Sequence, residues 1–408
     1  MRKRKDIISV LGLGYVGLPI FLRLQVKYQC VGFDIDKSRI DQLKKKNDKN
    51  FEFKKKDLNL SRGSLFTNDY LDLKKSTIFI ICVPTPINRQ NNPDLEAIIS
   101  ATNILTKVIK KGDIIIFEST VYPGVTEDIC EKYIERKTGL KSKVDFYISY
   151  SPERINPGDK KHVINKINKI LSVNFNDIKI IKKIKTVYKQ LSKKLIFSKF
   201  IKETEAAKLL ENIQRDINIA LMNEVLQICH RLNLNFQEVY RLAKTKWNFL
   251  KFYPGLVGGH CLPVDPYYLS HISKKKNYIA NFILTSRKVN DQMFKYVLEN
   301  IENFINKNKI LKPKILIMGI SYKPNIADTR NSIAFKIFKF LKKKYNKTEA
   351  LDPVINKKLL NNYKIMSQIR DFKTYDLIVP LVKHQEIIYM LKKINKNKSK
   401  ILDLFSFN

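Results

Sequence analysis

Short apolar segments alternate with amphipathic segments through the first half of the 408-residue chain. Two of them, Thr77 to Val83 and Asp113 to Phe117, are apolar on both faces, which is typical of strands in a parallel sheet covered by helices. A polar turn follows each segment, and a helical pattern follows the turn. The same rhythm predicts further strands at Ile7 to Leu11, Cys30 to Phe33 and Val144 to Ile148.

The first predicted strand runs directly into G-L-G-Y-V-G, which contains Gly12, Gly14 and Gly17. At this spacing the first glycine makes a tight turn, the second lets the backbone approach a pyrophosphate, and the third lets the helix pack on the strand. Asp34 ends the second strand, where a carboxylate accepts both ribose hydroxyls and repels a 2′-phosphate. The motif therefore predicts NAD, although the nearby cations of Lys37 and Arg39 weaken this argument slightly. The alternative is a glycine-rich turn without a ligand.

In the second half of the chain a helical period begins at Ile201 and continues to about Arg231. More helices are predicted at Asn235 to Lys246 and Asn277 to Asn308, and the strand-and-helix rhythm then returns. It predicts a strand at Lys314 to Gly319, a loop at Ser321 to Ser332 and a helix through Leu341. A short strand that ends at Ala350 to Pro353 comes next, followed by strands at Leu377 to Val382 and Ile401 to Phe405.

This pattern predicts an α/β protein with two Rossmann-like doubly wound domains, joined by a long central helix and a helical middle domain. We place an NAD-binding domain at residues 1–200, a central helical domain at 201–305 and a smaller α/β domain at 306–408. The G-x-G-x-x-G pattern does not recur in the last domain, so its ligand is not expected to be a second dinucleotide.

Cys261 lies in the glycine-rich stretch P-G-L-V-G-G-H-C-L-P-V-D-P, with Asp265 four residues further on. Gly258 and Gly259 give the backbone before the thiol unusual freedom, which we interpret as room for a substrate to approach. A cysteine in such a loop is a candidate nucleophile. The alternative is a small apolar residue packed in the loop.

Three polar residues, Lys208, Asn212 and Arg215, share one face of the predicted central helix. A cation, an amide and a cation on one face can hold an oxyanion or a phosphate, although such a row is also typical of an ordinary solvated stripe. Glu153, in a proline-rich loop, is a candidate base, or else a solvated charge. Lys323 and Arg330 suit phosphates or a sugar acid.

The chain carries 77 Lys+Arg against 38 Asp+Glu, a net charge of +39, and is 44% hydrophobic. The hydrophobic fraction is enough for globular cores. The positive charge is compatible with nucleic acid, an anionic membrane surface or a phosphorylated substrate. The lysines form short runs along the whole chain without a single basic arm, so we interpret them as a solvated surface.

The N-terminus, M-R-K-R-K and an apolar run, superficially resembles a secretory signal, but it holds three glycines and lacks an A-x-A cleavage site. No window has the roughly 18 uninterrupted apolar residues that a membrane span needs. The five cysteines lie far apart without C-x-x-C or metal-ligand spacing, which indicates a reducing cytoplasm and no metal site.

Seven motifs together resemble those of the UDP-glucose/GDP-mannose dehydrogenase family, whose members oxidise a nucleotide sugar at C6 to the uronic acid with two NAD. In chain order they are G-L-G-Y-V-G-L-P, V-P-T-P, E-S-T-V-Y-P-G-V-T-E, S-P-E-R-I-N-P-G, K-L-L-E-N-I-Q-R, G-G-H-C-L-P-V-D-P and S-Y-K-P-N-I-A-D-T-R-N-S. Thr245 to Cys261 is more similar to the bacterial UDP-N-acetylhexosamine branch. The chain departs from the family after the first helix, where Lys45 to Phe53 lacks the usual glycine, and near His384.

The chemistry of such an oxidation explains the cysteine. Oxidising a primary alcohol gives an aldehyde, and a second hydride cannot leave until a nucleophile adds to the carbonyl. Cys261 would add as the thiolate, giving a thiohemiacetal, then a thioester, then the acid. Lys208 and Asn212 would stabilise the oxyanion, and Asp265 would help to position a base or water. The resemblance implies that Thr120 and Glu153 hold and activate that water.

The resemblance also implies which residues bind the ligands and the partner chain. Cofactor-binding positions are expected at Gly12, Gly14, Tyr15, Val16, Gly17, Asp34, Arg39, Pro84, Thr85, Thr120 and Arg330. Substrate-binding positions are expected at Glu153, Arg154, Lys208, Asn212, Arg215, Phe249, Tyr253, Gly255, Gly258 and Lys323. A UDP-sugar is the expected substrate, in the synthesis of surface polysaccharide precursors. A homodimer through the central helix is expected, with no nucleic acid or membrane partner.

The sequence is compatible with three functions. The first is four-electron oxidation of a UDP-N-acetylhexosamine, with UDP-glucose or UDP-ManNAc as the alternative substrate. The second is a two-electron NAD-dependent alcohol or hydroxyacid dehydrogenase in which Cys261 is inert. The third is a nucleic-acid or anionic-surface binder, which the net charge alone suggests.

Overall fold

The computed structural model describes residues 6–49, 53–154, 166–355, 363, 365–369, 371–394 and 400–405. The chain forms two compact units. The first contains Met1–Glu211 and Tyr267–Asn277, and the second contains Asn212–Pro266 and Tyr278–Asn408.

The first unit is built on an eight-stranded sheet of order β3-β2-β1-β4-β5-β6-β7-β8, in which only β6 and β7 pair antiparallel. The strands are β1 Ile7–Leu11, β2 Gln29–Phe33, β3 Leu65–Thr67, β4 Ile78–Ile81, β5 Asp113–Phe117, β6 Phe146–Tyr150, β7 Asn168–Val173 and β8 Lys194–Ser198. The first six follow the order of a dinucleotide-binding fold, whose ligand crevice opens between β1 and β4 at the carboxyl ends of the strands.

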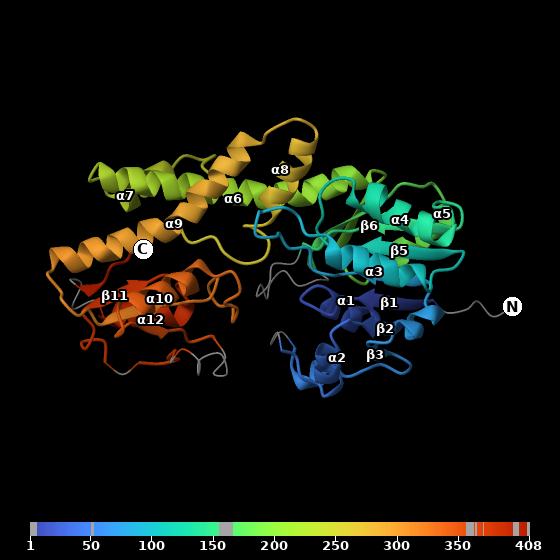
Figure 1. The fold of residues 1–408 in the computed structure, drawn as a ribbon, viewed down its shortest axis with the longest axis horizontal. Coiled ribbons are helices and arrows are strands. Elements are labelled where there is room, and N and C mark those ends of the chain that lie inside the picture. Colours follow the sequence, from blue (N-terminus) through green and yellow to red (C-terminus); the bar gives the residue numbers. More distant parts are fainter. Residues whose placement is uncertain are drawn as a thin grey trace. The chain divides into compact units, whose positions relative to one another are not determined.

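Helices lie against this sheet, as Figure 1 shows for α1 to α5. Their bounds are α1 Gly17–Leu24, α2 Lys37–Lys44, α3 Glu96–Thr106, α4 Lys132–Thr138 and α5 Ile178–Tyr188, with short 3-10 helices at Lys55–Leu58 and Tyr70–Lys75 and a π-helix, η3, at Val125–Glu131. Every residue of β4 and β5 is buried. The sequence prediction of a sheet covered on both faces is confirmed.

Two helices contribute residues to both units: α6 Ile201–Arg231 and α8 Asp265–Lys275. The bounds of α6 agree with those predicted from its helical period. The α8 helix begins at Asp265, so the carboxylate predicted to follow the cysteine in a loop is the first residue of a helix.

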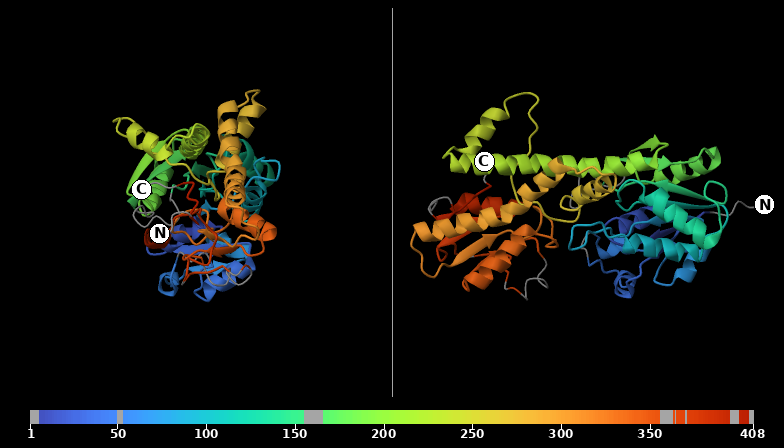
Figure 2. Two further views of the ribbon diagram at one scale, coloured as in Figure 1. Left: turned by 90° about the vertical axis from the view of Figure 1, so that its left-hand side faces the viewer. Right: turned by 45° about the horizontal axis from the view of Figure 1, so that its top comes forward.

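The second unit packs α9 Asn281–Lys307 beside a three-stranded parallel sheet of order β10-β9-β11, which Figure 2 shows in orange and red. Its other elements are α7 Phe236–Ala243, β9 Ile315–Met318, α10 Ile333–Lys344, β10 Glu349–Leu351, β11 Leu377–Pro380 and α12 Gln385–Ile394. Met222 and Leu226 of α6, Met293 and Val297 of α9 and Ile337 of α10 share one apolar core. Burial of these side chains holds the helices on the sheet.

The turn after β9 repeats the turn after β1. Gly12 donates its N–H to Phe33 O at 2.8 Å, and Gly319 donates to Leu351 O at 2.8 Å, both with positive φ. Asp352 then accepts the N–H of Ile320 at 2.8 Å, as Asp34 accepts that of Leu13 at 2.8 Å. This local repeat agrees with the prediction of a second Rossmann-like domain.

Two predicted strands need correction. The segment predicted at Val144 to Ile148 forms β6 two residues later, at Phe146–Tyr150, because Val144 is exposed in the preceding turn. The strand predicted at Ile401 to Phe405 does not form within the described residues, where only Ile401 makes an isolated bridge to Ile378. No helix among the described residues is both long enough and apolar enough to span a membrane.

Candidate active site

The three motif glycines have two different physical roles. A Cβ on Gly12, whose φ is +90°, would lie 2.8 Å from Cys82 O, and one on Gly17 would lie 1.8 Å from Gly12 O. A Cβ on Gly14 would meet no atom within 4 Å. The first and third glycines are therefore required by packing. The open space at Gly14 fits a pyrophosphate close to the backbone.

The N-terminus of α1 also fits an anion. Its N-cap residue, Val16, provides no side-chain cap, so the first N–H groups of α1 have no side-chain partner from it. Beside it Asp34 accepts Leu13 N at 2.8 Å through Oδ2 and Asp36 N at 3.0 Å through Oδ1. A carboxylate retains further lone pairs, so Asp34 can shape the loop and still accept ribose hydroxyls.

Arg39 has a different environment from the one expected of a cofactor ligand. It is 2% exposed, with Nε donating to Leu13 O at 2.9 Å and Nη1 donating to Asp48 at 2.8 Å. The guanidinium therefore supports the glycine loop from inside the protein. It does not offer a surface cation to a 2′-phosphate, which strengthens the argument from Asp34 for NAD.

The turns after β4 and β5 are joined by hydrogen bonds. Thr85 Oγ1 donates to Thr120 O at 2.6 Å, and Ser119 Oγ donates to Val83 O at 2.7 Å. Tyr268 of α8 donates to Pro86 O at 3.1 Å. The predicted positions Pro84, Thr85 and Thr120 thus lie on one cross-linked edge, at the carboxyl ends of the strands.

Glu153 is buried in a network of charges rather than exposed in a loop. Its Oε2 accepts from Lys169 Nζ at 3.0 Å, and the same Nζ donates to Glu118 Oε2 at 2.8 Å. Tyr188 donates to Glu118 Oε1 at 2.7 Å. The interpretation of Glu153 as an ordinary solvated charge is therefore wrong. Residues 155–165, which include the rest of its predicted loop, lie outside the described part of the chain.

Burial governs the ionisation of this network. It raises the pKa of Glu118 to about 7, against the lowering influence of Lys169. Burial alone would lower the pKa of Lys169, but Glu118 and Glu153 more than reverse this and raise it. Sequence reasoning did not identify Glu118, Lys169 or Tyr188 as site residues. Glu118 stands in the E-S-T motif, but nothing in the local sequence distinguishes Lys169 from the surface lysines.

On α6, Lys208 and Asn212 are each 8% exposed, whereas Arg215 is exposed. Asn212 Nδ2 donates to Asp265 Oδ2 at 2.6 Å. A solvated stripe would expose all three side chains, so that alternative fails for Lys208 and Asn212. Arg154, predicted to bind substrate, pairs with Glu211 at 2.7 Å.

The thiol of Cys261 is exposed, while the four other cysteines are buried. Cys261 O accepts from Val264 N at 3.0 Å and Asp265 N at 2.9 Å, so the residue makes the turn that begins α8. This places an accessible nucleophile one turn before the buried Asp265, which is 3% exposed. A packed apolar cysteine would be buried, so that alternative is not supported.

The two glycines before the cysteine are explained by packing within the second unit. A Cβ on Gly258 would lie 2.6 Å from Asn331 O, and one on Gly259, at φ +90°, would lie 2.8 Å from the Tyr322 ring. Asn331 Nδ2 also donates to Gly259 O at 3.3 Å. The positive φ of Gly259 agrees with the predicted unusual backbone, and close approach of the loop that follows β9 gives both glycines a packing role as well. That they also make room for substrate stays a prediction.

The same loop carries Arg330, whose guanidinium binds Asp328 at 2.7 to 3.1 Å. His260 Nε2 lies 3.7 Å from Asp328. Burial would raise the pKa of Asp328, but His260 and Arg330 hold it well below its usual range. Lys323 is nearby in sequence, and its carbonyl accepts from Ser321 Oγ at 3.0 Å.

The segment before the cysteine loop is fixed by side chains of α6 and α7. Asn223 Nδ2 donates to Gly255 O at 3.1 Å, and Gly255 N donates back to Asn223 Oδ1 at 2.8 Å. The rings of Phe249 and Tyr253 lie 5.7 and 5.1 Å from that of Tyr240. These contacts therefore fix the predicted substrate positions Phe249, Tyr253 and Gly255.

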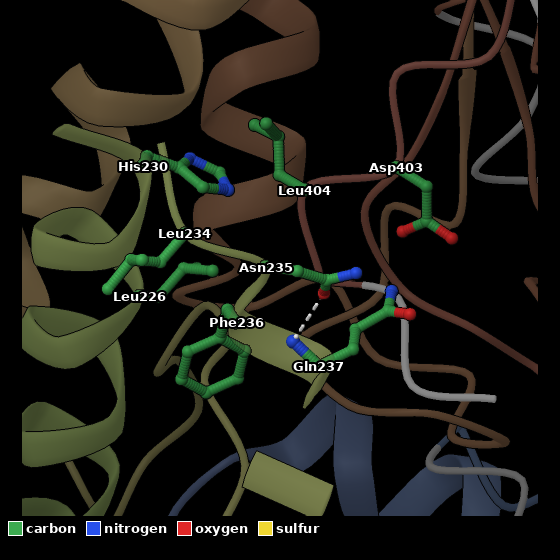
Figure 3. Close-up of a pocket in the computed structure, with 8 residues that line it drawn as sticks. All are labelled: Leu226, His230, Leu234, Asn235, Phe236, Gln237, Asp403 and Leu404. Atoms are coloured by element: carbon green, nitrogen blue, oxygen red, sulfur yellow. Dashed lines mark hydrogen bonds between the residues drawn. The ribbon is translucent and has the colours of Figure 1, made fainter. Parts of the chain in front are cut away.

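Figure 3 shows a small pocket elsewhere in the second unit, at the start of α7. Its volume is 130 Å³, below the roughly 300 Å³ at which small-molecule sites begin. It is lined by Leu226, His230, Leu234, Asn235, Phe236, Gln237, Asp403 and Leu404. None of the predicted site residues is among them, and the pocket is too small for a nucleotide sugar.

A Rossmann sheet with this glycine loop, in a chain that also presents an exposed thiol, is the layout of a dinucleotide-dependent dehydrogenase. Models of the UDP-glucose/GDP-mannose dehydrogenase family match the chain at residues 6–192 for the NAD-binding domain, 202–292 for the central domain and 316–407 for the UDP-binding domain. The chain belongs to this family, and its cofactor is NAD.

Similar proteins cover nearly the whole chain. A UDP-N-acetyl-D-glucosamine 6-dehydrogenase of Salmonella typhi is 41% identical over 97% of this chain and 95% of its own length. One of Pseudomonas aeruginosa is 38% identical over 98% and 97%. The solved structure of a UDP-D-ManNAc dehydrogenase from Pyrococcus horikoshii has a TM-score of 0.85 at 31% identity, covering 97% of this chain and 94% of that one.

Proposed function

We propose that the protein oxidises the C6 hydroxymethyl group of a UDP-N-acetylhexosamine to the uronic acid, in a four-electron reaction. The observation that carries this proposal is the exposed thiol of Cys261, one turn before the buried pair of Asp265 and Asn212. A two-electron alcohol dehydrogenase has no need of a nucleophile at this point in the chain.

NAD, when bound, accepts one hydride in each of the two oxidations. In our proposal the Cys261 thiolate adds to the intermediate aldehyde and forms a thiohemiacetal, whose oxidation gives a thioester. Water then breaks the C–S bond, which releases the carboxylate and restores the thiol. Lys208 stabilises the oxyanion, with Asn212 in support, and Thr120 and Glu153 hold and activate the water.

We propose an N-acetylhexosamine as the sugar. The support is that the relatives from S. typhi and P. aeruginosa are both named UDP-N-acetyl-D-glucosamine 6-dehydrogenases, and that the P. horikoshii structure is that of a UDP-D-ManNAc dehydrogenase. The stretch Thr245 to Cys261 supported the same choice in the sequence. A relative from Staphylococcus aureus, 38% identical, is named protein CapL, which agrees with a role in surface polysaccharide precursors.

The test is turnover of the purified protein with NAD and a panel of UDP-GlcNAc, UDP-GalNAc, UDP-ManNAc and UDP-glucose, with NADH and uronic acid both measured. We expect two NADH per sugar and the highest turnover with an N-acetylhexosamine. One NADH per sugar would support a two-electron dehydrogenase instead. Highest turnover with UDP-glucose would overturn the choice of sugar but not the four-electron reaction.

We also propose a homodimer that assembles through α6 and works in the cytoplasm. Leu221 and Ile228 lie seven residues apart on one face of α6 and are 50% and 48% exposed. Leu232, just beyond the end of α6, is 62% exposed, and Trp247 is 91% exposed. A row of exposed apolar side chains on a long helix is typical of a surface that another chain covers. The free cysteines among the described residues suit a reducing compartment.

A further inference from the structure

The buried network around Lys169 has more negative than positive groups. Lys169 is fully buried at the start of β7, and its ammonium group lies 2.8 Å from Glu118 and 3.0 Å from Glu153. Glu118 follows β5, and Glu153 follows β6. One cation is thus shared by two carboxylates from two neighbouring strand ends.

Glu153 is held through both of its oxygens. Oε2 accepts from Lys169, and Oε1 accepts the backbone N–H of Arg154 at 2.6 Å. These bonds fix the direction of the carboxylate. Such an arrangement suits a group that must present a base in a defined direction.

A purely structural ion pair would need only one carboxylate. Burying a second one costs free energy, because a buried anion without a cation of its own loses its hydration. A second carboxylate has a function if its negative charge offsets part of the effect of the Lys169 ammonium on Glu153. Glu118 is that second carboxylate. An ammonium paired with Glu153 alone would make that carboxylate a much weaker base.

We propose that Lys169 is a positioning residue for Glu153, and that Glu118 shares its charge so that Glu153 stays basic enough to activate water. This inference rests on the proposed function, because it assigns the setting of Glu153 in that reaction. Tyr188, which donates to Glu118, holds the second carboxylate in place. The side chains of Lys169 and Glu118 are fully buried, so in this proposal both act through Glu153.

Among the described residues, the other titratable groups whose charges act on the network are Cys82 and Tyr188. Burial raises the pKa of Cys82 and of Tyr188 well above their usual values, so both stay neutral near pH 7. The pKa of Glu118, about 7, lies in the working range. When Glu118 takes up a proton, the whole charge of Lys169 acts on Glu153, and the base weakens.

The experiment compares wild type with Glu118→Gln, Lys169→Met and Lys169→Arg in the full-length protein. Lys194→Met is the matched control, because Lys194 is an exposed lysine on the neighbouring strand β8. Two readouts are taken for each protein. One is the pH profile of kcat and KM. The other is the ionisation midpoint of the infrared carboxylate band that disappears in Glu153→Gln, which does not depend on turnover.

In Glu118→Gln we expect the midpoint of the Glu153 band to fall by about one to three pH units, with kcat lower by about tenfold or more. Lys169→Met should move the midpoint the other way, Lys169→Arg should lie near wild type, and Lys194→Met should change neither readout. If Lys169→Met does not fold, Glu118→Gln still tests the inference. KM for the sugar and NAD affinity should stay within about twofold in Glu118→Gln, because neither binding surface changes.

A Glu153 midpoint that does not move in Glu118→Gln would overturn the inference, even if the melting temperature falls, because Glu118 would then not share the charge of Lys169 with Glu153. A midpoint that falls while kcat and its pH profile stay as in wild type would also overturn it, because a merely structural network would give that result. The failure of the proposed function looks different. In that case wild type forms no uronic acid from any UDP-sugar, or Glu153→Gln keeps full activity, while the midpoint in Glu118→Gln still moves.

Discussion

Gly14 and Gly17 belong to one motif, but the structure predicts opposite results when each is replaced by alanine. A methyl group on Gly14 enters open space, whereas one on Gly17 would overlap Gly12 O at 1.8 Å. Gly14→Ala should therefore fold normally and lose NAD affinity by about tenfold or more, since the methyl group occupies the approach of the pyrophosphate.

Gly17→Ala is the contrasting variant. It should lower the melting temperature by several degrees, because the helix must move away from the glycine turn. Calorimetric melting and NAD titration of both variants provide the measurement. A Gly14→Ala protein that melts early, or a Gly17→Ala protein as stable as wild type, would contradict this division of roles.

At the residue scale, the sequence was informative where a motif carries its own geometry. Gly12, Gly14 and Asp34 could be placed because their spacing fits a strand, a turn and a helix. Lys169 could not be placed, because in a chain with 77 Lys+Arg a lysine among apolar residues looks like part of the surface. Its burial depends on two carboxylates, from the turns that follow β5 and β6, which only the assembled sheet brings together.

At the element scale, the π-helix η3 depends on a carboxylate from another helix. Its N-cap, Gly124, has no side chain, and Glu205 of α6 accepts Gly124 N at 2.6 Å and Thr126 N at 3.0 Å. Glu205 is fully buried, and burial raises its pKa from the ordinary 4.5 to about 7 despite these bonds. The loop that carries Thr120 is thus anchored at its far end by α6.

A raised carboxyl pKa contributes stability that is fully present below the unfolded value and is lost as the pH rises through the folded value. The stability of wild type relative to Glu205→Gln should therefore fall by about 2 kcal/mol between roughly pH 5 and pH 8. Urea unfolding of both proteins across this range measures it, with Glu203→Gln, an exposed position on the same helix, as the control. A difference that stays constant with pH would contradict the raised pKa.

Elements with a strong period were predicted best. The bounds of β1, β5 and α6 agree with the sequence prediction, because β1 runs directly into the glycine motif, β5 has an apolar run from Ile114 to Phe117, and α6 has a long helical period. The strands β7 and β8 were missed, since lysine and serine limit their longest apolar runs to Ile170–Leu171 and Leu195–Phe197. The strand predicted at Ile401 to Phe405 does not form, because an apolar segment becomes a strand only where it pairs with the edge of a sheet. Of its residues, Ile401 alone forms a bridge, to Ile378.

At the scale of the whole molecule, the exposed row on α6 predicts the oligomeric state. Wild type should sediment as a dimer, and the double variant Leu221→Glu with Ile228→Glu should sediment as a monomer, because charges cannot be buried in an apolar interface without a partner. Leu311→Glu is the matched control, since Leu311 is 95% exposed and lies outside α6. A fully active wild-type monomer would contradict the proposed dimer.

Cys261→Ala tests most directly whether the thiol of Cys261 carries the second oxidation. The variant should bind NAD as wild type does, since the glycine loop and Asp34 are unchanged, but form uronic acid on the order of a thousandfold more slowly. Cys261→Ser should also stall, because a hydroxyl is a far weaker nucleophile than a thiolate near pH 7. Melting temperature and NAD affinity check the fold of both variants. A Cys261→Ala protein that still forms the acid within about tenfold of wild type, at two NADH per sugar, would contradict covalent catalysis by this cysteine.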